Sequence, residues 1–511
     1  MGVDGFWSFE RVREAVGGEW AVTPDGPAAH GRDACAAGVL GASIDTRTLR
    51  PGEVFFALRG ERTDGHRFLG AAAAAGASMA VVEDPSCARA PGLPEGFPVL
   101  RVLDAAGALL RLGTAYRRTF RATRVVAVTG SNGKTTTTQL IRAVLEGGGL
   151  RGSASIKSYN NALGVPLTLL GVREGDRFVI CEAGTNSPGE IGVLGDALRP
   201  DVAVITSIGR AHVEAFGSVE RIAEEKFDLA RAVPPGGVLV WNKDAPCLPR
   251  LVATLRGVRT VGVGFGAGAD LSVVGVVEND GGVEFGVRKE EGWETGRGKA
   301  PPQDAEAPPR DDEWVRRDQE VSRFRLPLLG RHNAMNAACA IAVAREFGVG
   351  DGAVREAFVG FAAPGMRLER RCIAGITVLN DAYNANPDSV LAGLAAFAGA
   401  SADATRRVVV LGEMLELGAA ADDAHREIAR AAARVADAAV FVGSRAADMA
   451  DAWRESGGGG APAQVATLDA GGAGAVASLL RPGDAVLLKA SRRVGLERVV
   501  EALAAAHADA R

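Results

Sequence analysis

Residues Val125–Thr138 read VVAVTGSNGKTTTT, an apolar run followed by glycines, a lysine and hydroxyl residues. The apolar run predicts a strand and Gln139–Leu145 predicts a helix, so Gly130 and Gly133 lie in the turn between them. Backbone N–H groups can face phosphate oxygens where side chains are absent, while a lysine and a hydroxyl there bind phosphate and Mg²⁺. The pattern predicts a loop for a nucleoside triphosphate, in a shortened form because Val128 occupies the position of the usual first glycine.

Polar residues also follow the apolar strands that come next along the chain. Ligands of an open parallel sheet bind at the carboxyl ends of its strands, so side chains at these positions are candidates for chemistry. A glutamate that ends a buried strand is suited to hold a metal directly or through water. Read singly, each residue has an ordinary structural alternative, but together they predict one site. The residues are Glu182, Thr206, Ser207, His212 and Asn242.

The elements that must position these residues form three α/β units. A length of 511 residues exceeds what one hydrophobic core usually organises. We expect a small α/β unit over 1–120, a doubly wound parallel sheet over 121–362 and a Rossmann-like unit over 363–511, with a hinge near 362–365. Residues 288–320 are charged and rich in proline, which indicates an exposed insertion. The strands expected are 54–58, 79–83, 99–102, 125–128, 178–181, 202–205, 238–241, 377–379, 408–411, 439–442 and 485–488; the helices expected include 69–77 and 334–347.

Composition excludes several classes of protein. Lys plus Arg is 58 and Asp plus Glu is 62, a net charge of −4, which argues against a general nucleic-acid binder. No apolar run is long enough to span a membrane and the start lacks a signal-peptide pattern. Six scattered cysteines fit neither a disulfide framework nor a zinc knuckle. A cytoplasmic protein is the simplest interpretation, and we expect a monomer.

Motifs along nearly the whole chain resemble those of the Mur ligases, the ATP-dependent enzymes that extend the cytoplasmic peptidoglycan precursor. The stretches TGSNGKTTT and HNAMN are typical of the superfamily, whereas DAYNANP and LGEMLELG point to the branch that adds D-alanyl-D-alanine to a UDP-N-acetylmuramoyl-tripeptide. The resembling stretches include 43–66, 129–137, 160–170, 182–191, 209–218, 330–340, 366–369, 381–389, 411–418 and 489–497.

The resemblance implies a reaction in which ATP phosphorylates a substrate carboxylate and an amine then attacks the acyl phosphate. It implies that Lys134 contacts the phosphates, that Thr135 and Glu182 hold one Mg²⁺, and that His212 helps to hold a second. Lys226 aligns with the lysine that is carbamylated in the family; the alternative is an exposed helix lysine paired with acidic neighbours. The residues expected to bind ATP are Gly130, Ser131, Asn132, Gly133, Lys134, Thr135, Thr136, Asn336, Arg367 and Asp381.

The resemblance also implies where the substrates bind. The N-terminal unit would take the UDP end of the precursor, the central cleft would orient its peptide arm, and the C-terminal unit would dock the dipeptide. For Asn336, capping of a helix is as good an interpretation as ligand binding. For the N-terminal residues, a turn stabilised by local side-chain hydrogen bonds is an equally good alternative. The respective residues are Ser43, Thr46, Arg47 and His66; Asn160, Asn161, Thr185 and Asn186; and Tyr383, Asn384 and Asn386, with Lys489 and Arg492 as cationic candidates for the dipeptide carboxylate.

Three other functions remain in competition at this stage. The nearest is another ligase of the same fold, either one that adds the third residue of the peptide or a folate polyglutamate ligase. The second competing function is that of a nucleotide-binding switch without ligase activity. A Rossmann dehydrogenase is disfavoured, because no G-x-G-x-x-G turn is followed by an acidic residue about 20 positions later.

Overall fold

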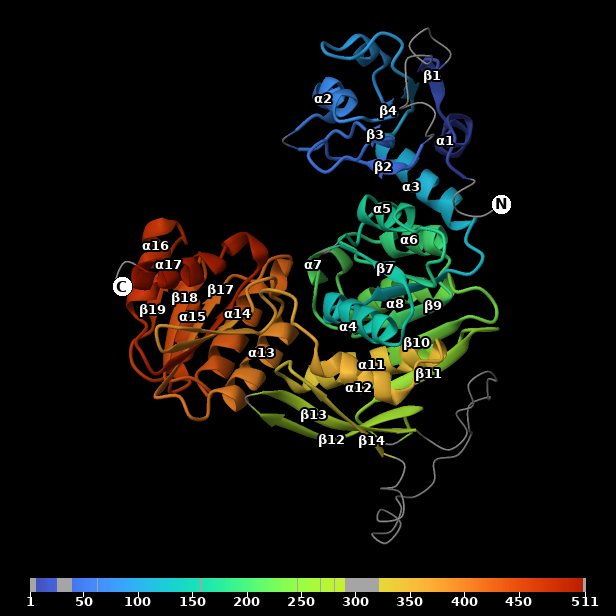
Figure 1. The fold of residues 1–511 in the computed structure, drawn as a ribbon. Helices are drawn as coiled ribbons and strands as arrows, with labels where there is room; N and C mark the ends of the chain where they lie inside the picture. The colour runs from blue at the N-terminus through green and yellow to red at the C-terminus, as the bar shows by residue number, and fades with distance from the viewer. Residues whose placement is uncertain are drawn as a thin grey trace.

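A computed structural model of the chain describes residues 6–24, 39–61, 63–156, 159–245, 247–266, 268–279, 281–289 and 321–508. Within these ranges the chain forms three sheets in succession, each covered by helices (Figure 1). The three-unit α/β fold expected from the sequence is therefore confirmed.

The N-terminal sheet has the strand order β1-β5-β4-β3-β2. Its strands β2 to β5 are parallel, and β1 pairs antiparallel with β5. Every residue of β4 is buried, as expected of a parallel strand covered on both faces. The elements are α1 (Phe9–Val16), β1 (Glu19–Val22), β2 (Gly41–Ser43), β3 (Glu53–Phe56), α2 (Leu69–Ala74), β4 (Met79–Val82), β5 (Val99–Arg101) and α3 (Ala105–Arg117).

The middle sheet has the order β14-β13-β12-β11-β10-β9-β6-β8-β7, and the strands from β7 to β12 along this order are parallel to one another. One face packs on α4, α11 and α12, and α5, α6 and α8 cover the other. Its elements are β6 (Arg124–Thr129), α4 (Lys134–Gly147), β7 (Gly152–Ala154), α5 (Gly164–Leu170), β8 (Phe178–Glu182), α6 (Glu190–Leu198), β9 (Val202–Ile205), α7 (Val213–Phe216), α8 (Val219–Arg231), β10 (Val238–Asn242), α9 (Leu248–Val252), β11 (Arg259–Gly264), β12 (Leu271–Asn279), β13 (Gly282–Lys289), β14 (Val321–Leu326), α11 (Arg331–Glu346) and α12 (Asp351–Val359).

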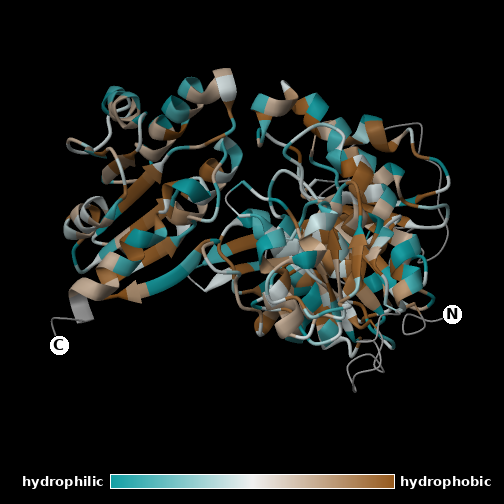
Figure 2. Cartoon of the chain, turned by 90° about the horizontal axis from the view of Figure 1, so that it is seen from above, coloured by the Kyte–Doolittle hydropathy of each residue, from teal (hydrophilic) through white to brown (hydrophobic). Residues whose placement is uncertain are grey.

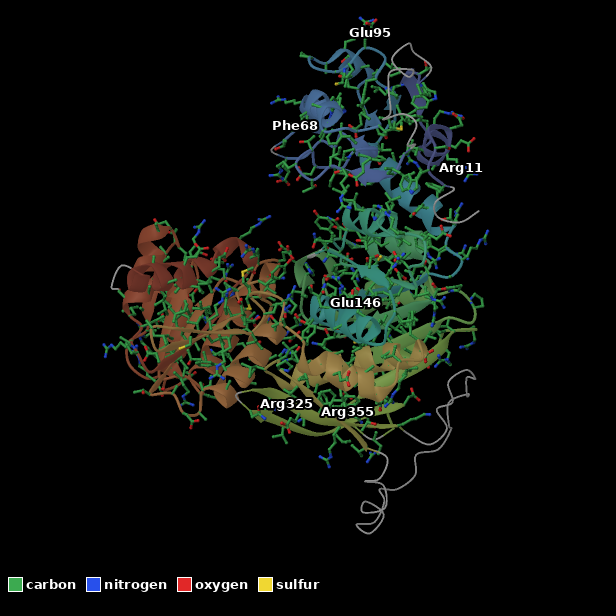
Figure 3. All side chains as sticks on the ribbon, in the orientation of Figure 1. Arg11, Phe68, Glu95, Glu146, Arg325 and Arg355 are labelled. Carbon is green, nitrogen blue, oxygen red and sulfur yellow. The ribbon has the colours of Figure 1, made fainter. Side chains whose placement is uncertain are left out.

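The strands β12, β13 and β14 form an antiparallel extension that the sequence analysis did not predict. Arg288 and Lys289, which were assigned to the charged insertion, belong to β13 and pair with β12. The rest of that segment, 290–320, lies outside the described residues. Arg355 of α12 lies over the extension, with its guanidinium 5.4 Å from the centre of the Phe324 ring (Figure 3).

The C-terminal sheet has the order β15-β16-β20-β17-β18-β19 and is parallel except for the edge strand β15. Its central strands are largely hydrophobic, whereas its helices carry both hydrophilic and hydrophobic residues (Figure 2). The elements are β15 (Glu369–Ile373), β16 (Ile376–Asn380), α13 (Pro387–Ala400), β17 (Arg406–Gly412), α14 (Ala421–Ala432), β18 (Ala438–Val442), α15 (Ala446–Glu455), β19 (Ala463–Val465), α16 (Ala470–Ser478), β20 (Asp484–Lys489) and α17 (Glu497–Ala508).

The helix α3 joins the N-terminal sheet to the middle sheet. The hydroxyl of Tyr116 donates to the carbonyl of Val172 at 2.8 Å, and Arg117 donates to the carbonyl of Leu198 at 2.8 Å. A Cβ atom on Gly113 would lie 2.6 Å from Pro166 of α5, so glycine permits this close helix contact. One continuous hydrophobic core runs through both units.

Two predictions from composition can be compared with the structure. The cysteines within the described ranges, Cys87, Cys181, Cys247, Cys339 and Cys372, are all free, while Cys35 lies outside those ranges. Among the described helices, none combines the length and the apolar character that crossing a membrane requires.

Candidate active site

The predicted phosphate loop connects β6 to α4. Gly130 and Gly133 have φ values of +150° and +83°, conformations that favour glycine. A Cβ atom on Gly133 would lie 2.5 Å from the Asn336 amide oxygen, so the loop has no space for a side chain there. Gly133 is also the N-cap of α4 and supplies no capping side chain. The first N–H groups of α4 are therefore left without a side-chain cap, as an anion site requires.

Lys134 lies at the first position of α4, and its ammonium donates to the carbonyl of Gly130 at 2.9 Å. Burial lowers the pKa of Lys134, the carboxylate of Glu182 opposes this shift, and Arg367 adds to it. The ammonium is thus held beside the loop that a triphosphate would occupy.

Glu182 ends β8 and is 2 % exposed. Its carboxylate accepts from the Thr135 hydroxyl at 2.7 Å and from the Asn160 amide at 2.9 Å. The Thr135 hydroxyl also accepts from Arg367 at 2.9 Å. Carboxylate and hydroxyl oxygens are the ligands that Mg²⁺ prefers, and protein sites for this ion commonly supply only one or two of them beside phosphate oxygens and water. Thr135 and Glu182 therefore fit a magnesium ion, although no cluster of three or more His, Cys, Asp or Glu occurs among the described residues.

His212 lies in the loop before α7 with a left-handed backbone conformation. Its Nδ1 atom contacts the carboxylate of Glu416, which comes from the C-terminal unit. The hydrogen bond to His212 is the main cause that lowers the pKa of Glu416. Glu416 lies in the LGEMLELG motif, but no local pattern in the sequence connects it to His212, so this contact could not be predicted.

Lys226 lies in α8 and is 1 % exposed, so it is not the exposed, acid-paired lysine that was the alternative interpretation. Burial, together with the positive charge of Lys134, lowers its pKa to about 7, while the carboxylate of Glu225 opposes the shift. The Glu225 carboxylate caps α6 by accepting from the N–H groups of Gly189 and Ile191. A lysine with this pKa is substantially uncharged at neutral pH and is nucleophilic.

A cavity of about 1180 Å³ lies between the carboxyl ends of the middle and C-terminal strands. Most of the predicted site residues line this cavity, whereas Gly130 and Lys226 do not. The predicted residues that line it are Ser131, Asn132, Gly133, Lys134, Thr135, Thr136, Asn160, Asn161, Glu182, Thr185, Asn186, Thr206, Ser207, His212, Asn242, Asn336, Arg367, Asp381, Tyr383, Asn384, Asn386 and Lys489.

Some of these residues also have structural partners. The Asn161 side chain accepts from the N–H groups of Leu163 and Gly164, and the Thr185 hydroxyl donates to the carbonyl of Ser187. Asn336 donates to the amide oxygen of Asn333 at 3.0 Å. Gly330 is the N-cap of α11, so Asn336 does not cap this helix.

The C-terminal side of the cavity carries charged and aromatic groups in pairs. The guanidinium of Arg367 lies 4.2 Å from the centre of the Tyr383 ring. Lys489 donates to Asp381 at 2.5 Å and to the carbonyl of Asn384 at 3.1 Å. Asp381 therefore already neutralises Lys489, which was a candidate for binding the dipeptide carboxylate. Arg492, the other candidate, is not among the residues that line the cavity.

The four residues predicted to bind the UDP end lie elsewhere, in the N-terminal unit, and none of them lines the cavity. Arg47 pairs with Asp45 at 2.6 Å and, through its hydrogen bonds, lowers the pKa of Asp45 to about 2. His66 uses both ring nitrogens, contacting Asp64 at 2.7 Å and accepting from the N–H of Glu83 at 3.1 Å. The remaining two are Ser43, which bonds to the backbone of Asp45, and Thr46.

Three family models match the chain in order. They are described as Mur ligase family, catalytic domain (39–115), Mur ligase middle domain (128–344) and Mur ligase, glutamate ligase domain (366–492). These ranges follow the three units of the fold.

Proteins of similar sequence and structure have names that describe Mur ligases. The UDP-N-acetylmuramoyl-tripeptide--D-alanyl-D-alanine ligase of Mycobacterium tuberculosis (strain ATCC 25618 / H37Rv) is 35% identical over 97% of this chain and 97% of its own. The Bacillus subtilis (strain 168) protein of the same name is 33% identical over 91% of this chain and 93% of its own. A crystal structure of MurF from Acinetobacter baumannii superposes with a TM-score of 0.78 at 25% identity, covering 97% of this chain and 98% of that one. With relatives of this identity and coverage, the chain belongs to the Mur ligase family.

Proposed function

We propose that the chain is the ATP-dependent ligase that joins D-alanyl-D-alanine to UDP-N-acetylmuramoyl-tripeptide in peptidoglycan precursor synthesis. The observation that carries the proposal is the cavity between two sheets, in which Lys134, Thr135 and Glu182 face Arg367 and Asp381. The names of the relatives, which match this chain over nearly its whole length, support the same activity.

The residues of the cavity can reduce the electrostatic repulsion between the two anionic reactants, the substrate carboxylate and ATP. Two unit charges about 4 Å apart interact with about 4 kcal/mol at an effective dielectric constant near 20, so a substrate carboxylate is repelled by the phosphate that it must attack. Lys134 and the N-terminus of α4 neutralise phosphate oxygens, and Arg367 adds a cation from the opposite unit. Magnesium, when held by Thr135 and Glu182, supplies further positive charge at the same place.

We further propose that Lys226 becomes a carbamate and, with His212, holds a second magnesium ion. In this step the uncharged Nζ of Lys226 attacks carbon dioxide, forms an N–C bond and releases a proton. The lowered pKa of Lys226 supports this role, because the attack needs an uncharged amine. His212 contacts Glu416 through Nδ1, so an ion bound through that nitrogen must displace Glu416.

The remaining roles are proposed by unit. The N-terminal unit would bind the UDP end through Ser43, Thr46, Arg47 and His66, for which Arg47 must exchange Asp45 for pyrophosphate. The C-terminal unit would dock the dipeptide beside Tyr383. The 1–120, 121–362 and 363–511 boundaries, the monomeric state and the cytoplasmic location remain predictions.

The test uses purified protein, ATP, Mg²⁺, D-alanyl-D-alanine and each of two UDP-linked tripeptides, one ending in diaminopimelate and one in lysine. We expect release of phosphate that requires both peptide substrates, and a pentapeptide product detected by mass spectrometry. Phosphate release that ignores both substrates would instead indicate a nucleotide switch. Ligation of an amino acid to a UDP-linked dipeptide, or of glutamate to a folate, would identify one of the rival ligases.

A further inference from the structure

The turn formed by Gly209 and Arg210 touches both the phosphate loop and the C-terminal unit. The N–H of Gly209 donates to the Ser131 hydroxyl at 2.9 Å, and that hydroxyl lies 3.2 Å from the Gly209 carbonyl. Ser131 belongs to the phosphate loop, so the position of this turn depends on the conformation of that loop.

Arg210 reaches two carboxylates of the C-terminal unit. Its Nε atom donates to Asp388 of α13 at 2.9 Å, and its terminal nitrogens donate to Glu427 of α14 at 2.6 Å and 3.2 Å. Its backbone N–H also donates to Asp388, at 2.7 Å. A Cβ atom on Gly209 would lie 2.3 Å from an Asp388 oxygen, so the absence of a side chain at 209 permits this approach.

The geometry of these contacts makes them stronger than a single surface ion pair. The side chains of Arg210 and Asp388 are each 35 % exposed and that of Glu427 is 42 % exposed, a range in which one isolated pair contributes little. Here one guanidinium donates to two carboxylates, to Glu427 through two nitrogens, and the backbone adds a further bond. The partners lie 178 and 217 residues away from Arg210 in the sequence, so the contacts bind two units together.

We propose that Arg210, with Asp388 and Glu427, forms a latch that holds the C-terminal unit against the nucleotide end of the middle sheet. Arg210 is then a positioning residue for the ligase reaction, and the proposal rests on the proposed function. ATP bound between Lys134 and Arg367 needs both units in this arrangement. The apparent affinity for such a ligand falls in proportion to the fraction of molecules that are latched.

The central test compares Arg210→Gln, Glu427→Gln and the double variant with the wild-type enzyme. Glu427 does not line the cavity, so its substitution affects the latch without altering the site itself. We expect each variant to raise the KM for ATP by about 3- to 10-fold with kcat within about twofold, because ATP at saturation restores the latched arrangement. The double variant should be no worse than Arg210→Gln. Independent, multiplying effects of the two substitutions would overturn the proposal.

Arg231→Gln is the matched control. Arg231 also pairs with two carboxylates, Glu224 and Asp228, but all three residues lie in α8 of the middle unit. This variant should leave the KM for ATP unchanged. Arg210→Lys should recover only part of the loss, because an ammonium lacks the planar arrangement that engages both carboxylates.

Two further measurements separate a latch from general damage to the fold. Raising the salt concentration should increase the KM for ATP in the wild type more than in Arg210→Gln. Small-angle X-ray scattering without nucleotide should give a larger radius of gyration for Arg210→Gln than for the wild type. The latch alone is refuted if the wild type ligates and the Arg210→Gln variant has the same KM for ATP, salt response and radius of gyration as the wild type. The proposed function is refuted if the wild type does not ligate.

Discussion

The middle and C-terminal sheets present their carboxyl ends to the same cavity, but the helices that follow begin in opposite ways. In the middle sheet, α4 follows Gly133, which gives no side-chain cap, and starts with Lys134. In the C-terminal sheet, α13 is closed by a capping box between Asn386 and Ser389 and has Asp388 in its first turn. An uncapped, cationic helix start attracts anions, whereas a capped, acidic one repels them. The difference supports the proposal that the phosphates bind at the middle sheet, although the strands that face the cavity are parallel in both sheets.

The largest effect should come from removing the cation that distinguishes the two helix starts. Lys134→Met keeps the apolar stem and loses the ammonium, and we expect phosphate release in the ligase assay to fall by about 10²–10³-fold. Arg142→Gln on the same helix is the control, because Arg142 only pairs with exposed Glu146. Comparable activity in the Lys134→Met variant and the wild type would mean that α4 does not bind the triphosphate.

A smaller loss should follow from changing Lys226, the buried lysine of α8 whose pKa the charge of Lys134 helps to lower. Lys226→Ala should lower kcat by about 10–100-fold, the range seen when a group supporting a metal site is lost. Acetate or another short carboxylate should restore part of the activity by replacing the carbamate oxygens. Full activity in Lys226→Ala, or an inactive variant that no carboxylate rescues, would argue against the carbamate.

Removing the side-chain cap of α13 should mainly lower the stability of the fold, with a smaller effect on nucleotide binding. Asn386→Ala removes the capping bond to Ser389 and the paired amide bonds to Asn132 in the phosphate loop. We expect the free energy of unfolding to fall by about 0.5–2 kcal/mol in chemical denaturation. Ser218→Ala, which removes the cap of α8, should cost a similar amount. Only Asn386→Ala should also raise the KM for ATP; an unchanged KM in Asn386→Ala would mean that the paired amides have no part in nucleotide binding.

The smallest effect concerns pH and the loop that carries Glu416. Buried His425 contacts the carbonyl of Ala421 through Nδ1 and accepts from the N–H of Met414 through Nε2, so it is neutral in the fold. Burial lowers its pKa below the ordinary 6.5. The unfolded chain then binds the proton more readily, so the stability from His425 is complete above about pH 6.5 and declines as the pH falls toward the lowered pKa. Unfolding measured from pH 7.5 to 5 should show this loss in the wild type, and a His425→Gln variant with the same slope would exclude His425 as its source.

The sequence predicted the elements whose signal is local. Buried strands such as β6, β8, β9 and β10 read as continuous apolar runs, and the loop at Gly130–Gly133 carries its own motif. The antiparallel strands β12 to β14 were missed, because β12 is half exposed and lacks an apolar run along its whole length.

In the site, too, the features with a local signal could be predicted, whereas contacts between units could not. Residues at strand ends were placed together correctly, since parallel topology brings those ends to one edge. The contacts of His212 with Glu416 and of Arg210 with Asp388 could not be predicted, because each joins two units whose relative placement no local pattern specifies. For the N-terminal residues, the sequence analysis offered a locally bonded turn as an alternative without naming partners. The structure shows such local bonds, from Arg47 to Asp45 and from His66 to Asp64, each partner two residues away in the sequence.

The helix α3 fixes the N-terminal unit to the middle unit, whereas the C-terminal unit can move relative to it. Tyr116 and Arg117 fasten the N-terminal unit to the body of the middle sheet, and a shared core fills the junction. The C-terminal unit has largely separate cores and follows a connecting segment at 360–368. A protease that cuts this connection should therefore release the C-terminal third first, leaving a two-unit fragment that still melts as one cooperative block.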